Sequence, residues 1–222
     1  MEENMLMYWS GGKDSVMALY EARTNRRYRE LQVVSLLTTL TEGYDRISGH
    51  GVRRVLLEYQ ADCLGLNLHK TYIPKNAAMS QYEAVIEEAL LQHKAGGTSV
   101  AGTGDIFIEK RRMNTFKKTG VKGCFPLMRK NSYEHIGKIM DLGFKAYVVC
   151  VDGKVLDQSF VGRMIDREFL NDLPSGVDLC GENGEYHSFV FDGPMFNKPV
   201  KFKLGEVVFR ESFYFCDLLP DS

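Results

Sequence analysis

The stretch from Met5 to Ala22, MLMYWSGGKDSVMALYEA, constrains the fold more than any other part of this chain. Its apolar beginning, Met5–Trp9, predicts a buried parallel strand. A glycine-bearing turn follows at Ser10–Ser15 and leads into an amphipathic helix, for which Asp14 or Ser15 suits the N-cap. Glycines let a backbone approach an anion closely, and the first N–H groups of a helix point toward it. The arrangement therefore predicts a phosphate-binding loop.

The side chains of this turn agree with that role. Lys13 would place a point charge against phosphate oxygens, and serine hydroxyls would donate hydrogen bonds. A Walker A loop is excluded, because it needs Ser or Thr after its lysine, where this chain has Asp14. The alternative is a tight strand-to-helix turn with an incidental lysine. The expected phosphate ligands are Ser10, Gly11, Gly12, Lys13, Asp14 and Ser15.

Composition narrows the class of protein. The 222 residues suffice for one large domain, or for one domain with a smaller appendage. Basic and acidic residues nearly balance, 28 against 29, which argues against a general nucleic-acid or membrane binder. The five cysteines contain no CxxC pair, so zinc-ribbon and disulfide-scaffold classes are disfavoured and buried core thiols are expected. Because the sequence shows neither a signal peptide nor a membrane span, we expect a cytoplasmic protein.

Strand patterns alternate with helical patterns along most of the chain. Beyond the first strand and helix, the periodicity predicts strands at 32–37, 68–73, 99–102, 123–127 and 145–151, and helices at 51–66, 80–94, 107–118 and 132–142. This alternation predicts an α/β fold, an open parallel sheet with helices on both faces. The pattern changes after Asp152, where strand patterns at 186–191, 200–204 and 207–215 follow one another without helices. We therefore expect one domain at 1–152 and a smaller C-terminal α+β domain at 153–222.

Polar and small residues follow two other predicted strands. Thr38 comes after the second strand, and the segment Gly102-Thr103-Gly104-Asp105 comes after the strand at 99–102. Parallel strands bring their carboxyl ends to one edge of an open sheet, where ligands bind. We expect Thr38, Gly102, Gly104 and Asp105 to contact a nucleotide there, and Asp105 to hold Mg²⁺ together with Asp14. A plain turn is the alternative for residues 102–105.

Two further polar clusters are candidates for substrate contacts. His50 directly precedes the predicted helix at 51–66, where it can bind a substrate or merely cap the helix. The second cluster, CGENGEYHSF at 180–189, gathers two carboxylates, an amide and an imidazole within six residues. That density suits the orientation of a polar substrate or ammonia. The alternative is a surface turn before an edge strand. The side chains in question are Glu182, Asn183, Glu185 and His187.

Taken together, these motifs resemble the diphthine–ammonia ligase family of ATP pyrophosphatases. The resemblance rests on SGGKDS at 10–15, GH at 49–50, GD at 104–105, the Arg112-Met113 pair and GENGEYHSFVFDGPMF at 181–196. SGGKDS alone resembles the PP-loop of the wider superfamily, whose members split ATP into AMP and pyrophosphate. The resemblance implies an adenine nucleotide alpha hydrolase-like domain that binds ATP and Mg²⁺, and a C-terminal domain that contributes the substrate site.

The reaction implied by the resemblance is adenylation of a small-molecule or protein-borne carboxylate, followed by attack of ammonia to form an amide. Free ammonium is the expected nitrogen source, since the chain shows no glutaminase domain. A ligase of this kind must orient ammonium and take protons from it, which carboxylates and a neutral imidazole can do. The catalytic candidates are Lys13, Asp14, Glu182, Glu185 and His187, and the substrate-binding candidates are His50, Arg112 and Asn183.

The chain departs from the family pattern at three positions. Diphthine ligases of eukaryotes and archaea tend to read GEGGEYET where this chain has Asn183 and His187, and Met128 stands where the family commonly places Trp. The GENGEYH form resembles a bacterial-type subgroup associated with cobalamin salvage, so both diphthine and a corrinoid-type carboxylate stay open as the acceptor. The alternatives are a PP-loop tRNA-modifying enzyme and an ATP- or AMP-binding sensor without turnover. No membrane or nucleic-acid partner is expected, and a homodimer stays open.

Overall fold

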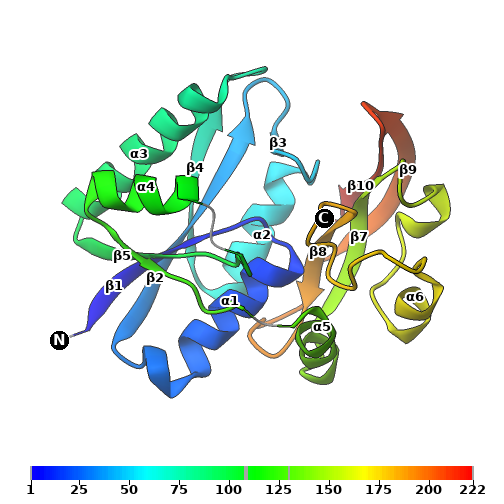
Figure 1. Ribbon diagram of the computed structural model, residues 1–222, viewed down its shortest axis with the longest axis horizontal. Helices are drawn as coiled ribbons and strands as arrows, with labels where there is room; N and C mark the ends of the chain where they lie inside the picture. Colours follow the sequence, from blue (N-terminus) through cyan, green and yellow to red (C-terminus); the bar gives the residue numbers. More distant parts are fainter. Residues whose placement is uncertain (1, 108–109, 130, 222) are drawn as a thin grey trace. The chain divides into compact units, whose positions relative to one another are not determined.

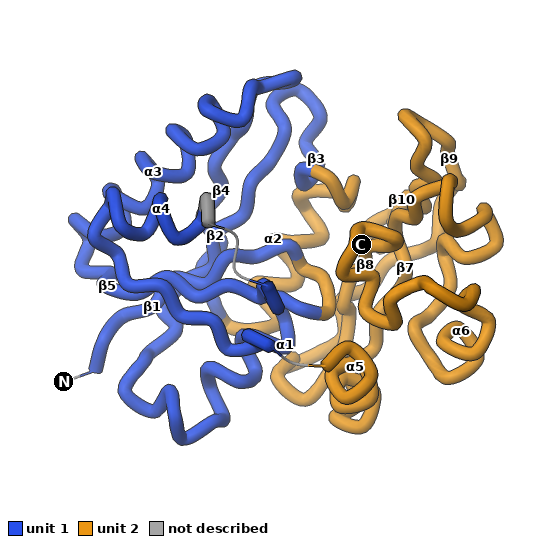
Figure 2. Tube along the Cα trace, viewed as in Figure 1, with its two compact units in different colours: residues 1–10, 14–48, 66–129 blue, residues 11–13, 49–65, 130–222 orange. Residues whose placement is uncertain are grey.

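The computed structural model describes residues 2–107, 110–129 and 131–221. The chain forms two compact units, shown in different colours in Figure 2. Unit 1 contains residues 1–10, 14–48 and 66–129, and unit 2 contains residues 11–13, 49–65 and 130–222. The first stretch of chain in unit 2 has only three residues, 11–13, which are the centre of the predicted phosphate loop.

Unit 1 is built on a sheet of six strands within the described residues. Five of them are parallel and follow the order β4-β2-β1-β5-β6, while the short β3 pairs antiparallel with the end of β2. From β1 the chain runs outward to β2 and β4 and then returns to β5 on the other side of β1, so the strand order reverses between β1 and β5. The strands are β1 (Glu3–Tyr8), β2 (Leu31–Thr41), β3 (Arg46–Ile47), β4 (Asn67–Ile73), β5 (Thr98–Gly102) and β6 (Lys122–Cys124).

Helices cover both faces of this sheet, as the sequence predicts. The α3 helix (Met79–Ala95) and the α4 helix (Lys110–Thr119) lie on one face, and α1 (Lys13–Thr24) lies on the other (Figure 1). The short helix η1 (Arg26–Tyr28) follows α1. One core layer packs Leu6, Leu37 and Ala101 of the sheet against Ile86, Leu90 and Phe116 of α3 and α4. Burial of this apolar face fixes the helices on the sheet.

Unit 2 contains an antiparallel sheet in the order β8-β7-β10-β9. Fully buried aromatic side chains, Phe169, Tyr186 and Phe189, form much of its core. The elements are α2 (Arg54–Leu64), α5 (Ser132–Asp141), β7 (Lys145–Asp152), η2 (Gln158–Phe160), α6 (Arg167–Asp172), β8 (Tyr186–Asp192), β9 (Phe202–Arg210) and β10 (Phe213–Pro220). Figure 1 shows β7, β8, β9 and β10 side by side.

The strand at 145–151 is real, but it does not extend the parallel sheet. The structure places it as β7, antiparallel to β8 and β10. A continuous apolar run such as KAYVVCV predicts a strand buried on both faces and carries no information about its partners. The chain accordingly divides between residues 129 and 130 rather than after Asp152, and unit 2 also takes in α2.

The predicted strand at 207–215 is broken by a turn. Glu211 and Ser212 both have positive φ, 50° and 74°, and they connect β9 to β10 as a tight hairpin. Two successive left-handed residues suit the right-handed twist of the flanking strands. Asn and Gly are the usual residues at such positions, so Glu-Ser gives no turn signal in the sequence.

Two helix beginnings also differ from the sequence predictions. The α1 helix begins at Lys13, so Asp14 lies in its first turn rather than at the N-cap. Instead of beginning at Ser80, α3 begins at Met79, and the Gln81 side chain accepts a hydrogen bond from the Ala78 N–H at 2.8 Å. Acidic and amide side chains stabilise a first turn as well as a cap, which leaves the exact start ambiguous in sequence.

The five cysteines are buried free thiols, as expected for core residues. Burial raises the pKa of the Cys150 thiol to about 12. Within the part of the chain that the structure describes, no helix is both long and apolar enough to cross a membrane.

Candidate active site

The predicted loops of unit 1 meet at the carboxyl edge of the parallel sheet. The Ser10 and Ser15 hydroxyl oxygens lie 3.3 Å apart, across the first turn of α1. Gly104, in the loop after β5, packs directly on that turn: a Cβ there would lie 2.7 Å from the Asp14 carbonyl carbon and 2.9 Å from the Ser15 nitrogen. Only glycine permits such a close approach, so position 104 requires a glycine.

Thr38 lies inside β2, which continues to Thr41, and not after the strand as the sequence predicted; it is close to the beginning of the loop. It follows Leu37 of β2, whose carbonyl accepts the Trp9 N–H at 2.8 Å. Thr38 is 1% exposed, and its hydroxyl finds no hydrogen-bond partner among the described residues. A buried hydroxyl without a partner costs free energy unless a ligand or a water satisfies it. The site therefore fits a polar ligand at this point.

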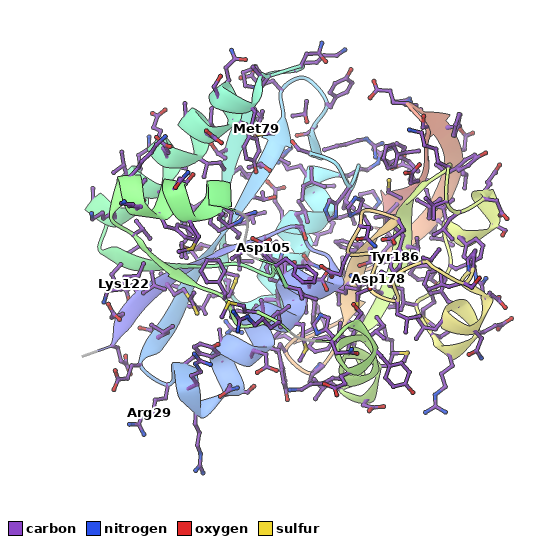
Figure 3. All side chains as sticks on the ribbon, viewed as in Figure 1. Arg29, Met79, Asp105, Lys122, Asp178 and Tyr186 are labelled. Carbon is purple, nitrogen blue, oxygen red and sulfur yellow. The ribbon has the colours of Figure 1, made fainter. Side chains whose placement is uncertain are left out.

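Asp105 and Arg112 form an ion pair, with the Arg112 Nε 2.5 Å from an Asp105 carboxylate oxygen. The Arg112 guanidinium also lies over the Tyr8 ring, 4.9 Å from its centroid. Burial raises the pKa of the Tyr8 hydroxyl, so that side chain stays neutral. Asp105 lies in the loop that follows β5, and it is labelled in Figure 3. Among the described residues no three His, Cys, Asp or Glu side chains gather as a metal cluster.

The centre of the predicted phosphate loop packs in unit 2, against β8. Gly11 has φ of +73°, and its carbonyl accepts the Val190 N–H at 2.9 Å. A Cβ on Gly11 would lie 2.6 Å from Leu57 Cδ2 of α2 and 2.8 Å from the Gln60 Oε1 atom. Positive φ and lack of space both require glycine at this position.

Lys13 is buried, with 4% of its surface exposed. Its backbone N–H, at the beginning of α1, donates to the Ser188 hydroxyl at 3.1 Å. Its Nζ lies 5.4 Å from the centroid of the Tyr186 ring, close enough for a cation–π interaction. Tyr186 and Ser188 both belong to β8. The strand that follows the GENGEYH segment therefore contacts the lysine of the phosphate loop.

Gln60 completes this arrangement, and sequence reasoning missed it. It is fully buried on α2, and its side-chain amide donates to the carbonyls of Gly11 at 3.0 Å and Val190 at 2.5 Å. Tyr59, the residue before it on the helix, is exposed, whereas Gln60 points inward. A polar residue flanked by apolar helix positions was the available signal, because a buried amide must have hydrogen-bond partners.

Glu185 is buried and holds the GENGEYH turn together. Its carboxylate accepts the backbone N–H of Asn183 at 2.9 Å, the Asn183 side-chain amide at 2.9 Å and the Asp178 N–H at 3.1 Å. Burial opposes ionisation of this carboxyl, but the hydrogen bonds from Asn183 and Asp178 outweigh it and hold the pKa below its usual value. Glu185 is thus an ionised acceptor directed at its own loop.

Asp178, also absent from the sequence-based candidates, anchors the same turn. Its carboxylate accepts the N–H groups of Cys180 at 2.8 Å and Glu182 at 3.3 Å, and the Ser132 hydroxyl of α5 at 2.7 Å. The Tyr186 hydroxyl donates to the Leu179 carbonyl at 2.5 Å. Figure 3 labels Asp178 and Tyr186 in this region of unit 2. The turn is a hydrogen-bonded platform that leaves Asn183 exposed and Glu182 half-buried.

The structure brings together two histidines that the sequence identifies separately. The rings of His50 and His187 stack with centroids 4.2 Å apart and an interplanar angle of 26°. His187 lies on β8 between Tyr186 and Ser188, and its side chain is half-buried like that of His50. Successive side chains of a strand point to opposite faces, so His187 is directed away from the side on which its two neighbours meet Lys13.

The fold and these residues define a doubly wound α/β protein that carries a second, antiparallel sheet. Two family models cover nearly all of it: the diphthamide synthase N-terminal domain matches residues 3–122, and the diphthamide synthase C-terminal domain matches residues 131–219. The chain belongs to the diphthamide synthase family, which confirms the resemblance seen in its motifs. This membership makes it an enzyme of the ligase class.

Curated relatives agree with the family models. The diphthine–ammonia ligase of Homo sapiens is 24% identical over 228 residues, which cover 93% of this chain and 85% of that protein. The diphthine–ammonia ligase of Bos taurus is 24% identical over 220 residues, covering 90% of this chain and 82% of that protein. One solved structure, a predicted subunit of tRNA methyltransferase from Methanocaldococcus jannaschii, matches with a TM-score of 0.44 and 16% identity over 66% of this chain and 80% of that chain.

Proposed function

We propose that this protein is an ATP-dependent amide-forming ligase, which adenylates a carboxylate with release of pyrophosphate and then transfers ammonia to it. The observation that carries the proposal is the buried phosphate loop itself. Gly11–Lys13 is held against β8 in a shape that only glycine permits, and Lys13 is buried beside the strand of the GENGEYH segment. A structural lysine rarely has its charge removed from water, because desolvation of an ammonium is costly.

The first half-reaction needs stabilisation of charge at phosphorus. When the carboxylate attacks the α-phosphate, negative charge develops on the phosphate oxygens, and pyrophosphate leaves. Lys13 and the backbone N–H groups at the start of α1 would bind those oxygens. Thr38 supplies a buried hydroxyl that a bound nucleotide would satisfy. Asp14 and Asp105 are the carboxylates that would hold Mg²⁺, which adds a Lewis acid at the phosphates when bound.

The second half-reaction needs a group that takes a proton from the attacking ammonia as AMP leaves the acyl group. His187 and Glu182 are suited to this role, because both side chains are only partly buried and lie on the platform formed by residues 178–187. Glu185 was predicted to act here too. Its carboxylate is directed at the N–H groups of its own turn, which supports a positioning role for it instead.

For the acceptor we propose a carboxylate other than diphthine, of the corrinoid type. The support is the pair of substitutions at Asn183 and His187, since an imidazole in place of an acid changes the charge that meets the acceptor. The His50 ring stacks on the His187 ring, so the substituted position carries two neighbouring imidazoles. A shared amidation chemistry with a different acceptor accounts for both the family membership and these substitutions.

The test is a comparison of acceptors with the purified protein. ATP and ammonium are supplied with a panel of corrinoid carboxylic acids, and separately with diphthine-bearing elongation factor. The expected result is ammonium-dependent amide formation on a corrinoid acid, with AMP released in equal amount. Amide formation on diphthine alone would refute the acceptor proposal and keep the ligase. ATP binding without AMP formation on any acceptor would favour a nucleotide sensor and reject the ligase.

A further inference from the structure

The geometry points to Gln60 as the residue that sets the shape of the phosphate loop, acting together with Ser188 as a clamp between that loop and β8. The inference deepens the proposed function and rests on it, because it assigns positioning residues to the same nucleotide site. Neither residue belongs to the loop, and the two lie far apart in the sequence.

The outer edge of β8 is hydrogen-bonded by residues that do not belong to its sheet. This strand is at one end of the antiparallel sheet within the described residues, so its outer backbone groups need partners from elsewhere. The Val190 N–H donates to the Gly11 carbonyl, and the Val190 carbonyl accepts from the Gln60 amide at 2.5 Å. Gly11 and Gln60 therefore bind the outward-facing backbone N–H and carbonyl of Val190 on this edge.

The carbonyl oxygen of Gly11 accepts two hydrogen bonds, from the Val190 N–H at 2.9 Å and from the Gln60 side-chain amide at 3.0 Å. Both lone pairs of that oxygen are thus engaged, which fixes the orientation of the peptide between Gly11 and Gly12. With the carbonyl held toward β8, the N–H of the same peptide must point the opposite way, because a peptide is planar and trans. The clamp thereby determines where a loop N–H is directed.

The same strand also holds the other end of the loop. The Lys13 N–H donates to the buried Ser188 hydroxyl at 3.1 Å, two residues before Val190 on the same strand. The segment Gly11–Lys13 is therefore held at both of its ends by one strand. Since Tyr186 of the same strand lies under the Lys13 ammonium, β8 positions the loop backbone and its lysine together.

The experiment compares Gln60→Met with Gln92→Met, a matched control. Met keeps the length of Gln without its donor, and Gln92 is an exposed side chain on α3 that donates to Glu88 of the same helix. Hydrogen exchange of the ligand-free proteins is followed over the peptide spanning residues 9–17. We expect at least tenfold faster exchange of the loop amides in Gln60→Met, together with at least a tenfold rise in the Kd for ATP, and no change in Gln92→Met.

Gln60→Glu gives a readout that general destabilisation would not produce. An ionised carboxylate would face two carbonyl oxygens and be repelled, whereas a protonated carboxyl can donate to one of them. Burial raises the pKa of such a carboxyl, so loop protection in this variant should be lost at pH 8 and partly recovered at pH 5.5. Gln60→Met should show no such recovery. Loop protection in Gln60→Glu, taken relative to the intrinsic exchange rate at each pH, that is the same at pH 5.5 and pH 8 would overturn the inference.

Ser188 supplies an independent check if the Gln60 variants do not fold. Ser188→Ala should speed exchange at Lys13, and Ser188→Thr, which keeps the hydroxyl, should restore protection. Wild-type exchange of the loop in both Gln60→Met and Ser188→Ala would overturn the inference. Failure of the proposed function is distinguishable, because the wild-type protein would then not bind ATP, while the ligand-free exchange comparison would still report whether the clamp exists.

Discussion

At the scale of single residues, the phosphate loop combines two requirements that a plain turn would not have. Position 11 requires glycine, because its φ is positive and a Cβ there would collide with Leu57. Lys13 is buried at the beginning of α1. A turn with an incidental lysine would expose that side chain to water, as lysines generally are. The burial of Lys13 therefore favours the phosphate-binding interpretation over the alternative.

Replacing Lys13 by Met should weaken ATP binding strongly. Met retains the apolar part of the side chain but removes the charge-assisted hydrogen bond, which is worth roughly 1.5–3 kcal/mol. Isothermal titration should therefore show an affinity loss of about one to two orders of magnitude. Lys118→Met, at an exposed position of α4, is the control and should bind like wild type. Equal ATP affinity in Lys13→Met and wild type would contradict a phosphate contact.

Gly11→Ala should destabilise the protein far more than Gly65→Ala. Both glycines have positive φ, 73° and 67°, so both substitutions introduce backbone strain of about 1 kcal/mol. Only at Gly11 would the new methyl group meet other side chains, whereas nothing lies within 4 Å at Gly65. Urea denaturation measures the difference in free energy of unfolding. Equal effects of the two substitutions would show that the loop is not packed as described.

Glu185 makes the stability of unit 2 depend on pH. Its pKa in the folded protein lies below the usual value of 4.5, so its stabilisation is present above pH 4.5 and is lost as the pH falls through the folded-state pKa. Glu185→Gln should lower the free energy of unfolding by about 1–3 kcal/mol at pH 7, because its amide cannot accept all three N–H groups. The difference from wild type should shrink below pH 4. A difference that stays constant from pH 7 to pH 3 would disprove this assignment.

At the scale of elements, sequence periodicity predicted most helices and strands, but not how the strands pair. The β7 strand was predicted correctly as an element and placed in the wrong sheet, because a fully apolar run fits a parallel or an antiparallel neighbour equally well. The turn between β9 and β10 was missed, since Glu211 and Ser212 adopt left-handed conformations without the residues that usually signal them. Pairing partners and turn geometry depend on tertiary contacts, which a periodicity does not contain.

Replacing Glu211-Ser212 in the hairpin between β9 and β10 by Asn-Gly should stabilise the protein by about 0.5–2 kcal/mol, because Asn and Gly adopt positive φ with little strain. The melting temperature should rise by a few degrees for a chain of this size. The same Asn-Gly replacement at Gln158-Ser159, where the residues form the short helix η2, should not stabilise. A lower melting temperature of the hairpin variant would show that the turn is held in another way.

At the scale of the whole molecule, the site candidates divide between the two units according to the elements that carry them. Motif reasoning proposes Lys13, Glu185 and His187 as site residues, because each lies in a short segment with a recognisable pattern. It missed Gln60 and Ser188, whose importance comes from contacts with residues far along the chain. Motifs thus identify the chemistry, and the three-dimensional structure identifies the residues that hold it in place.

The most direct test of the central claim is the identification of the ATP-derived products. Wild-type protein is incubated with ATP, Mg²⁺, ammonium and a carboxylate acceptor, and the phosphorus-containing products are followed by ³¹P nuclear magnetic resonance. The proposed ligase cleaves between the α- and β-phosphates, so AMP and pyrophosphate should appear in equal amounts and be lost in Lys13→Met. ADP and orthophosphate as the main products would contradict the claim.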